Sequence, residues 1–174
     1  MKTKKPAKKS AKKSPAPRKK VAPTPAGYHA VTPYLSVRGA AEAIDFYKKA
    51  FGAAEIMRMP GPDGKLGHAE IRIGDSRIML SDEYPGMDFL SPQSRGGTTV
   101  HIHLYVKDVD AMAERAVAAG AKLVRPVQDQ FYGDRTGSLA DPFGHVWHVA
   151  THKEDLSMAE LKRRAGQAAK QAPA

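Results

Sequence analysis

The sequence predicts an α+β fold in which two β-α-β-β-β modules form a cupped mixed-sheet groove. Apolar residues with strand-like and helix-like spacing alternate in that order, and the chain contains the order twice. The two helical regions also align: LSVRGAAEAIDFYKKAFGA (35–53) matches LYVKDVDAMAERAVAAGA (104–121) with a gap of one residue in the helix. An internal repeat of this size predicts two similar modules with a shared groove between their sheets.

The first module covers about residues 28–83 and begins with the extended run AVTPYLSV. A helix is expected next, because apolar residues recur at helical spacing until a glycine stops the pattern at position 52. The apolar helical positions are Ala40, Ile44, Tyr47 and Phe51. Turn sequences then separate three expected strands, at 54–59, 68–74 and 77–82.

The second module covers about residues 98–152 and repeats the order. Its first strand is VHIHLYV, and its helix is expected to run from about Asp108 to Gly120. The strand AKLVRPV follows, another strand lies within FYGDRTGSLA, and a DPFG turn leads into HVWHVAT. The two modules together predict one domain over residues 27–152.

Both ends of the chain differ in composition from this domain. The chain has 174 residues and a formal charge of +10, and residues 1–26 contain nine lysines, Arg18 and no acid. This Lys, Ala, Pro and Ser composition predicts a disordered basic tail, which is able to make weak, non-specific contact with nucleic acid. Residues 153–174 are expected to form a short helix and a tail, because Ser157 and Glu160 have capping-box spacing.

The absence of cysteine limits the available chemistry. Disulfides, thiolate metal sites and a cysteine nucleophile are excluded, which leaves His, Asp and Glu as the strong metal ligands. No apolar run approaches the roughly 18 residues of a membrane span, and no secretory signal follows the basic start. We therefore expect a cytoplasmic protein with no membrane partner.

Strand alternation selects candidate groove residues. If His101 faces the groove, then His103 and Tyr105 face it too, because side chains alternate along a strand. On the strand HAEIRIG the isoleucines suit the helix side, which turns the polar residues toward the groove. We expect Glu70 and His103 to be the candidate catalytic groups. The expected ligand-binding residues are Tyr34, His68, Arg72, Tyr105, Tyr132 and Arg135.

The remaining histidines are expected to have no part in the site. His29, His145 and His152 lie near strand ends or turns, where a side chain is usually exposed to solvent. The histidines of the groove could instead have no function in binding or catalysis. In that case they would only hydrogen-bond to each other, to a tyrosine or to water.

Several motifs resemble one known family. The segments VRGAAEAIDFYKKAFGA, FYGDR and DPFGHVW are similar, in this order, to those of the vicinal oxygen chelate (VOC) superfamily, the glyoxalase/bleomycin resistance/dioxygenase type, and above all its PhnB-like branch. The resemblance covers about residues 28–152. It implies the fold predicted above, a homodimer and a groove for a small organic molecule. It does not decide the reaction, because one fold hosts unrelated chemistries.

The resemblance also implies positions for a metal. Metal-using members take one ligand from the first strand and one from the last strand of each module. On this sequence those positions are Thr32, Leu80, His101 and His148. The histidines suit a metal, whereas leucine cannot bind one and a threonine hydroxyl binds poorly. A third ligand would have to come from Glu70 or His103.

Three functions stay open at this stage. The first is a protein that binds, and in some cases modifies, a small organic molecule in the groove without a cofactor. The second is a lyase, isomerase or dioxygenase that uses a divalent metal (Zn, Ni, Mn or Fe) on His101 and His148. The third is association with nucleic acid through residues 1–26. Whether the protein is an enzyme is not decided by the sequence.

Overall fold

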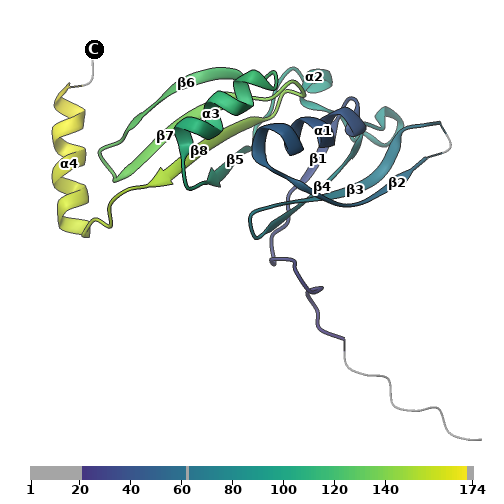
Figure 1. Ribbon diagram of the computed structural model, residues 1–174, viewed down its shortest axis with the longest axis horizontal. Coiled ribbons are helices and arrows are strands. Elements are labelled where there is room, and N and C mark those ends of the chain that lie inside the picture. The colour runs from purple at the N-terminus through teal and green to yellow at the C-terminus, as the bar shows by residue number, and fades with distance from the viewer. Residues whose placement is uncertain (1–20, 62, 172–174) are drawn as a thin grey trace, which may run out of the picture.

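The computed structural model describes residues 21–61 and 63–171, and in it the chain forms two four-stranded mixed sheets (Figure 1). The strand orders are β1-β4-β3-β2 and β5-β8-β7-β6. In each sheet the first strand is parallel to the last strand of its module, and the other pairs are antiparallel. The predicted α+β fold with two β-α-β-β-β modules is confirmed.

The elements follow the predicted order. The strands are β1 (Tyr34–Val37), β2 (Ala54–Pro60), β3 (Leu66–Ile73), β4 (Ser76–Asp82), β5 (His101–Tyr105), β6 (Lys122–Asp129), β7 (Asp134–Ala140) and β8 (Val146–His152). The helices are α1 (Ala40–Phe51), η1 (Pro85–Met87, a 3-10 turn), α2 (Pro92–Arg95), α3 (Val109–Ala118) and α4 (Met158–Gln171). The prediction of a disordered tail at 1–26 falls mainly on residues 1–20, which lie outside the described residues.

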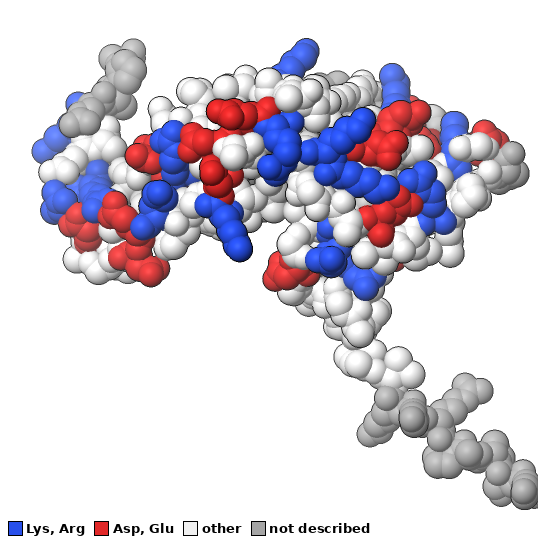
Figure 2. Space-filling view, in the orientation of Figure 1, with Lys and Arg blue, Asp and Glu red and all other residues white. Residues whose placement is uncertain are grey.

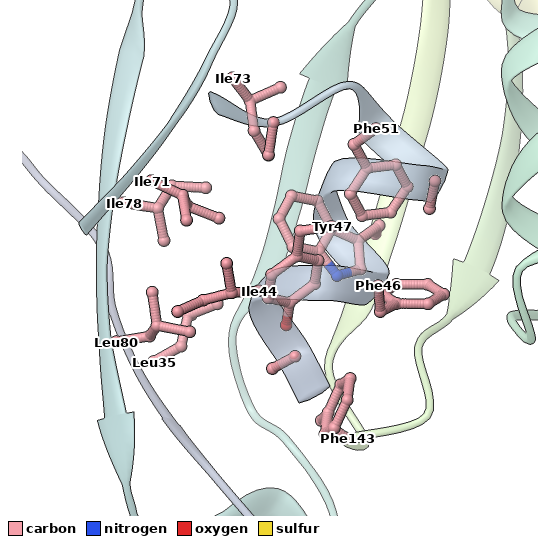
Figure 3. Close-up of a cluster of buried hydrophobic side chains, with 14 of the residues drawn as sticks. Leu35, Ile44, Phe46, Tyr47, Phe51, Ile71, Ile73, Ile78, Leu80 and Phe143 are labelled. Carbon is pink, nitrogen blue, oxygen red and sulfur yellow. The ribbon is translucent and has the colours of Figure 1, made fainter. Parts of the chain in front are cut away.

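One hydrophobic core joins the two modules. Aliphatic residues of the first sheet and aromatic residues of α1 and β8 belong to a single buried cluster. Figure 3 shows α1 with Leu35, Ile71 and Leu80 to one side of it and Phe143 beyond its other side. The rings of Phe51 and Trp147 lie 4.6 Å apart, so the helix of the first module packs on a strand of the second.

The position of the core decides where the polar faces lie. Each sheet turns one face to this core, and strand alternation turns the neighbouring side chains to the opposite face. The polar residues Glu70 and His148 therefore lie on faces that point away from the core. Apolar side chains fill the space between the two sheets of one chain. The shared groove that the repeat predicts is not formed there.

Leu80 is the clearest correction to the sequence analysis. Its side chain is fully buried in the core, so it faces α1 and does not belong to the polar face. The parallel strand registers pair Tyr34 with Met79 and His103 with His148. Because Tyr34 and His103 occupy the same position in their modules, the counterpart of His148 is Met79. The position that the resemblance implied, Leu80, is therefore one residue too far along β4.

A buried carboxylate of the second module also binds to α1 of the first module. Asp141 begins the DPFG turn, and its Oδ1 accepts hydrogen bonds from the backbone N–H groups of Phe143 and His145, both at 2.9 Å. Its Oδ2 accepts from the Tyr47 hydroxyl at 2.8 Å and from Trp147 Nε1 at 3.0 Å. Burial, and then the nearby carboxylate, raise the pKa of Tyr47 well above its usual range.

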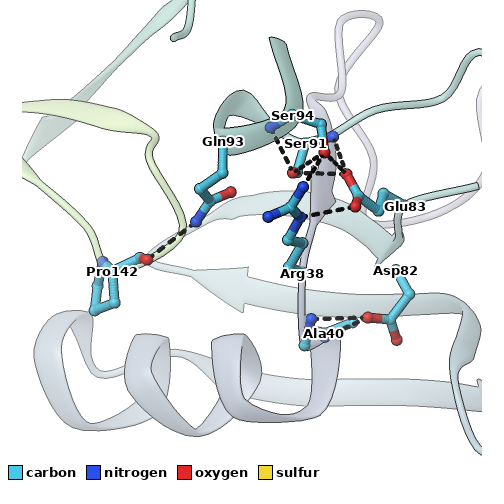
Figure 4. Close-up of polar contacts among 9 residues, drawn as sticks. Arg38, Ala40, Asp82, Glu83, Ser91, Gln93, Ser94 and Pro142 are labelled. Carbon is cyan, nitrogen blue, oxygen red and sulfur yellow. Dashed lines mark hydrogen bonds and ion pairs between the residues drawn. The ribbon is translucent and has the colours of Figure 1, made fainter. Parts of the chain in front are cut away.

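The segment between the modules is held to both of them (Figure 4). Glu83 accepts hydrogen bonds from Arg38 Nε at 2.8 Å, from the Ser94 hydroxyl at 2.6 Å and from the backbone N–H of Ser91 at 2.9 Å. On the other side, Gln93 donates to the carbonyl of Pro142 at 3.1 Å. The segment therefore fixes the second module against the first.

The C-terminal helix α4 extends from the body of the molecule beyond the ends of β6 and β7 (Figure 1). The backbone N–H of Glu160 donates to the Ser157 hydroxyl at 3.2 Å, as the capping spacing predicts. Among the described residues, no helix is long and apolar enough to cross a membrane.

Candidate functional site

A cavity of about 570 Å³ lies on the polar face of the second sheet. Side chains from all four strands of this sheet and from the loop between β6 and β7 line it. They include His103, Arg125, Gln128, Tyr132, Ser138 and His148. Its volume is in the range of small-molecule sites, and its lining is more polar than that of most such sites.

A chain of hydrogen bonds runs along the floor of this cavity. The register pairs Ser138 with His148 on β7 and β8, and the Ser138 hydroxyl lies 2.8 Å from His148 Nδ1. The other ring nitrogen of His148 lies 2.9 Å from His101 Nδ1. Burial, and then the neighbouring imidazoles of His101 and His103, lower the pKa of His148. His148 is therefore held in place through both of its ring nitrogens.

A second polar chain borders the cavity along β5. The rings of His103 and Tyr105 lie 4.7 Å apart, and the Tyr105 hydroxyl donates to Asp134 at 2.9 Å. The other oxygen of this buried carboxylate lies 2.7 Å from His152 Nδ1. The hydrogen bond to Asp134 and burial raise the pKa of Tyr105, and hydrogen bonds to Asp134 and Asp155 raise that of His152.

The polar face of the first sheet holds a separate network around Glu70. The Tyr28 hydroxyl donates to Glu70, Arg77 Nη1 lies 3.0 Å from the same carboxylate oxygen, and His68 lies 3.3 Å from the other. The Tyr34 hydroxyl and His68 Nδ1 are 3.0 Å apart. The hydrogen bond from Tyr28 is the largest cause that lowers the pKa of Glu70, and those from His68 and Arg77 add to it while burial opposes them.

Tyr28 and Arg77 are not among the residues that the sequence selected. Tyr28 precedes the first strand, and the guanidinium carbon of Arg77 lies 4.4 Å from its ring centroid. Strand alternation along 77–82 could have predicted the place of Arg77, because residues two apart share a face and Arg77 stands two residues before Met79. Nothing in the local sequence indicates that Tyr28 folds back onto Glu70.

The candidate residues divide into three groups. His103, Tyr132 and His148 line the cavity, with His101 and Tyr105 in contact with that group. Tyr34, His68 and Glu70 lie together on the other sheet. Arg72 lies on that sheet too, where it is exposed and donates to the carbonyl of Gly74 at 2.7 Å.

Two placements differ from the sequence analysis. Arg135 was expected at the groove, but its guanidinium lies 2.7 Å from Asp110 and 3.3 Å from Asp129, outside the residues that line the cavity. His145 was expected to be exposed, but it is buried, and its Nε2 lies 3.2 Å from the carbonyl of Ser36 in the first module.

The donor set fits a metal poorly. Thr32 uses its hydroxyl to donate to the carbonyl of His29 at 3.2 Å, Leu80 is in the core, and Met79 offers only a thioether. Two residues were expected as a third ligand. Glu70 is held by Tyr28 and Arg77 on the other sheet, and the ring centroid of His103 lies 6.3 Å from that of His148. Within residues 21–61 and 63–171, no three His, Asp or Glu side chains are grouped so that they could hold one ion.

Charged residues of both signs are spread over the two modules. Figure 2 shows Lys and Arg interspersed with Asp and Glu across the viewed face of the described chain.

Comparison with known proteins gives a consistent family assignment. The family model of the glyoxalase/bleomycin resistance protein/dioxygenase superfamily matches residues 28–149. The uncharacterized protein Rv0887c of Mycobacterium tuberculosis is 50% identical over 136 residues, which are 76% of this chain and 80% of the relative.

Solved structures agree with this match. TioX from Micromonospora sp. ML1 is similar to this chain with a TM-score of 0.56 and 26% identity, over 74% of this chain and all of TioX. Protein PA1353 from Pseudomonas aeruginosa has a TM-score of 0.58 and 25% identity, over 71% of this chain and 98% of its own.

Proposed function

Because this chain belongs to the glyoxalase/bleomycin resistance protein/dioxygenase superfamily, we propose that it binds a small organic molecule in the cavity of its second sheet, without a metal. The observation that carries the proposal is the cavity of about 570 Å³ with the Ser138–His148–His101 chain on its floor. Hydrogen bonds hold His148 in one orientation, so the cavity is organised before a ligand arrives.

We further propose that a second copy of the chain closes this cavity. The cavity is open because the first module of the same chain packs on the opposite, apolar side of the second sheet. Aromatic side chains stay exposed on the polar faces, among them Tyr34 at 44% and Tyr105 at 60% of full exposure. A homodimer in which the first module of one copy faces the second module of the other would cover both.

One observation favours the alternative function, in which the site binds a divalent metal: the imidazole rings of His101 and His148 lie close together. His101 and His148 direct nitrogens at each other at 2.9 Å, and an ion could replace the shared proton only with further ligands. Because the first module offers Thr32, Met79 and a Glu70 engaged elsewhere, we favour a site that works through hydrogen bonds.

Nuclear magnetic resonance of the imidazole rings tests the ligand site. Untagged protein is titrated with a panel of monoaromatic acids, amides and phenols while the ring signals of the histidines are followed. We expect saturable shifts for His103 and His148 with at least one compound class, and none for His29, which is exposed and outside the cavity. The variant His148→Phe should lose this binding, and the matched control His29→Phe should keep it.

Two outcomes contradict the proposal. If no compound class moves the His148 signal, the cavity is not the ligand site. If the untagged protein contains stoichiometric metal that is lost in His101→Ala, the site depends on metal and the second function replaces the first.

A further inference from the structure

We propose that the cavity of the second sheet selects a planar aromatic anion and that Arg125 binds the carboxylate of that molecule, an inference that rests on the ligand site proposed above. Arg125 lies on β6 and is the only permanently charged side chain among the ten residues that line the cavity. A single cation in a polar cavity without acids favours a negatively charged ligand.

The charge of Arg125 is not neutralised by the protein. Within the described residues, no acidic side chain forms an ion pair with it, although Asp129 and Asp134 are close in sequence. Asp129 is paired with Arg135, and Asp134 accepts from Tyr105 and His152. These two carboxylates, at the end of β6 and the start of β7, are therefore occupied by other partners, which leaves the guanidinium available for an outside anion.

The backbone of β6 is irregular at this residue. The pairing of β6 with β7 shifts register between Leu123 and Arg125 and again between Arg125 and Gln128. Irregularities of this kind in an edge strand change the direction of a side chain. As a result Arg125, Pro126 and Gln128 all line the cavity, although strict alternation would turn Arg125 and Gln128 to opposite faces.

The strand opposite accommodates this irregularity. Gly137 on β7 lies so close to β6 that a Cβ atom there would be 2.8 Å from Val127 Cγ2 and 3.2 Å from the carbonyl oxygen of Arg125. The missing side chain allows the irregular part of β6 to approach β7, so the position of Arg125 depends on the residue across from it.

The other cavity groups suit the remainder of such a ligand. Tyr132 offers an aromatic ring, and Gln128 and Ser138 offer neutral hydrogen-bonding groups. A guanidinium recognises a carboxylate through two parallel N–H donors, which gives orientation as well as affinity. A planar acid with a hydroxyl at its far end would use both kinds of group.

The test compares two probes of nearly the same shape, one with a charged carboxylate and one with a neutral amide. 4-Hydroxybenzoate and its neutral analogue 4-hydroxybenzamide are titrated into the full chain, and affinity is measured by calorimetry while the His148 ring signal reports the place of binding. We expect the acid to bind about tenfold or more tightly than the amide. Added salt should lower the affinity for the acid but not the affinity for the amide, because screening acts on the charged ligand.

Variants separate Arg125 from a general charge effect. Arg125→Gln should remove the preference for the acid and change the affinity for the amide less than about twofold. The control Arg163→Gln removes an exposed arginine of α4 and should keep the preference. Equal affinity of the two probes, or an unchanged preference in Arg125→Gln, would overturn the inference and leave the ligand site intact. If neither probe moves the His148 signal, the inference fails, and the ligand site fails with it only if no other compound class of the panel moves that signal.

Discussion

Replacement of Asp141 by asparagine should destabilise the fold strongly, because this buried carboxylate accepts four hydrogen bonds. In Asp141→Asn the amide oxygen still accepts from the two backbone N–H groups, but as a neutral acceptor, which costs about 1 kcal/mol for each. The amide nitrogen then faces the Trp147 N–H, and a buried donor without an acceptor costs about 1–3 kcal/mol. Tyr47 can rotate its hydroxyl to accept, so the total is about 3–5 kcal/mol.

Equilibrium unfolding in urea at fixed protein concentration measures this loss. A chain of 174 residues should also melt roughly 6–20 °C lower in the variant. The matched control is Asp45→Asn, which removes an exposed carboxylate of α1 that lies 4.0 Å from Lys48 and should change stability by less than about 0.5 kcal/mol. A loss below about 1 kcal/mol in Asp141→Asn would refute the role of this carboxylate in joining the modules.

Three further predictions concern pH, the first module and the loop at the cavity. The hydrogen bonds from Ser94 and its neighbours lower the pKa of Glu83 to about 2, so its stabilisation is complete above its ordinary pKa and is lost as the pH falls toward 2. The stability gap between the protein and Glu83→Gln should narrow over that range in acid unfolding, and a constant gap would contradict the assignment. Tyr28→Phe removes the largest cause that lowers the pKa of Glu70, so carbon NMR of the carboxyl group should show a higher pKa. Gly133→Ala should cost about 1–3 kcal/mol in urea unfolding, because φ is 94° there and a Cβ atom would lie 2.5 Å from the backbone oxygen of Glu154. An unchanged pKa, or an unchanged stability, would show that these contacts have little energetic weight.

The fold could be predicted from the sequence because its signals are local and occur twice. Apolar spacing identified the strands and the helix of each module, although not the short elements η1 and α2 between the modules, and the alignment around Phe51 and Gly120 identified the repeat. The same alternation placed Glu70 and His68 on one polar face, where they lie 3.3 Å apart. What local spacing does not contain is how the modules pack, because that depends on which faces of α1 and β8 meet.

The errors in the candidate site have the same origin. Counting from a turn misplaced the counterpart of His148 by one residue, because the β3–β4 and β7–β8 turns differ in length. Arg125 was missed because two register shifts break the alternation on which the search depends, although Pro126 in the middle of a strand is a sign of an irregular edge. His145 is buried by the first module, a contact between residues distant in the sequence.

The most direct test of the account is whether the polar faces of two copies meet. The chain has no cysteine, so a single engineered cysteine takes one spin label. Chains labelled through Arg72→Cys on the first sheet are mixed with chains labelled through Gln128→Cys on the second, and dipolar coupling is measured between copies. We expect a dimer with a short distance between these two labels, and a longer distance when the first label is attached through Lys49→Cys on α1 instead. A monomer without coupling, or the reverse order of distances, would contradict it.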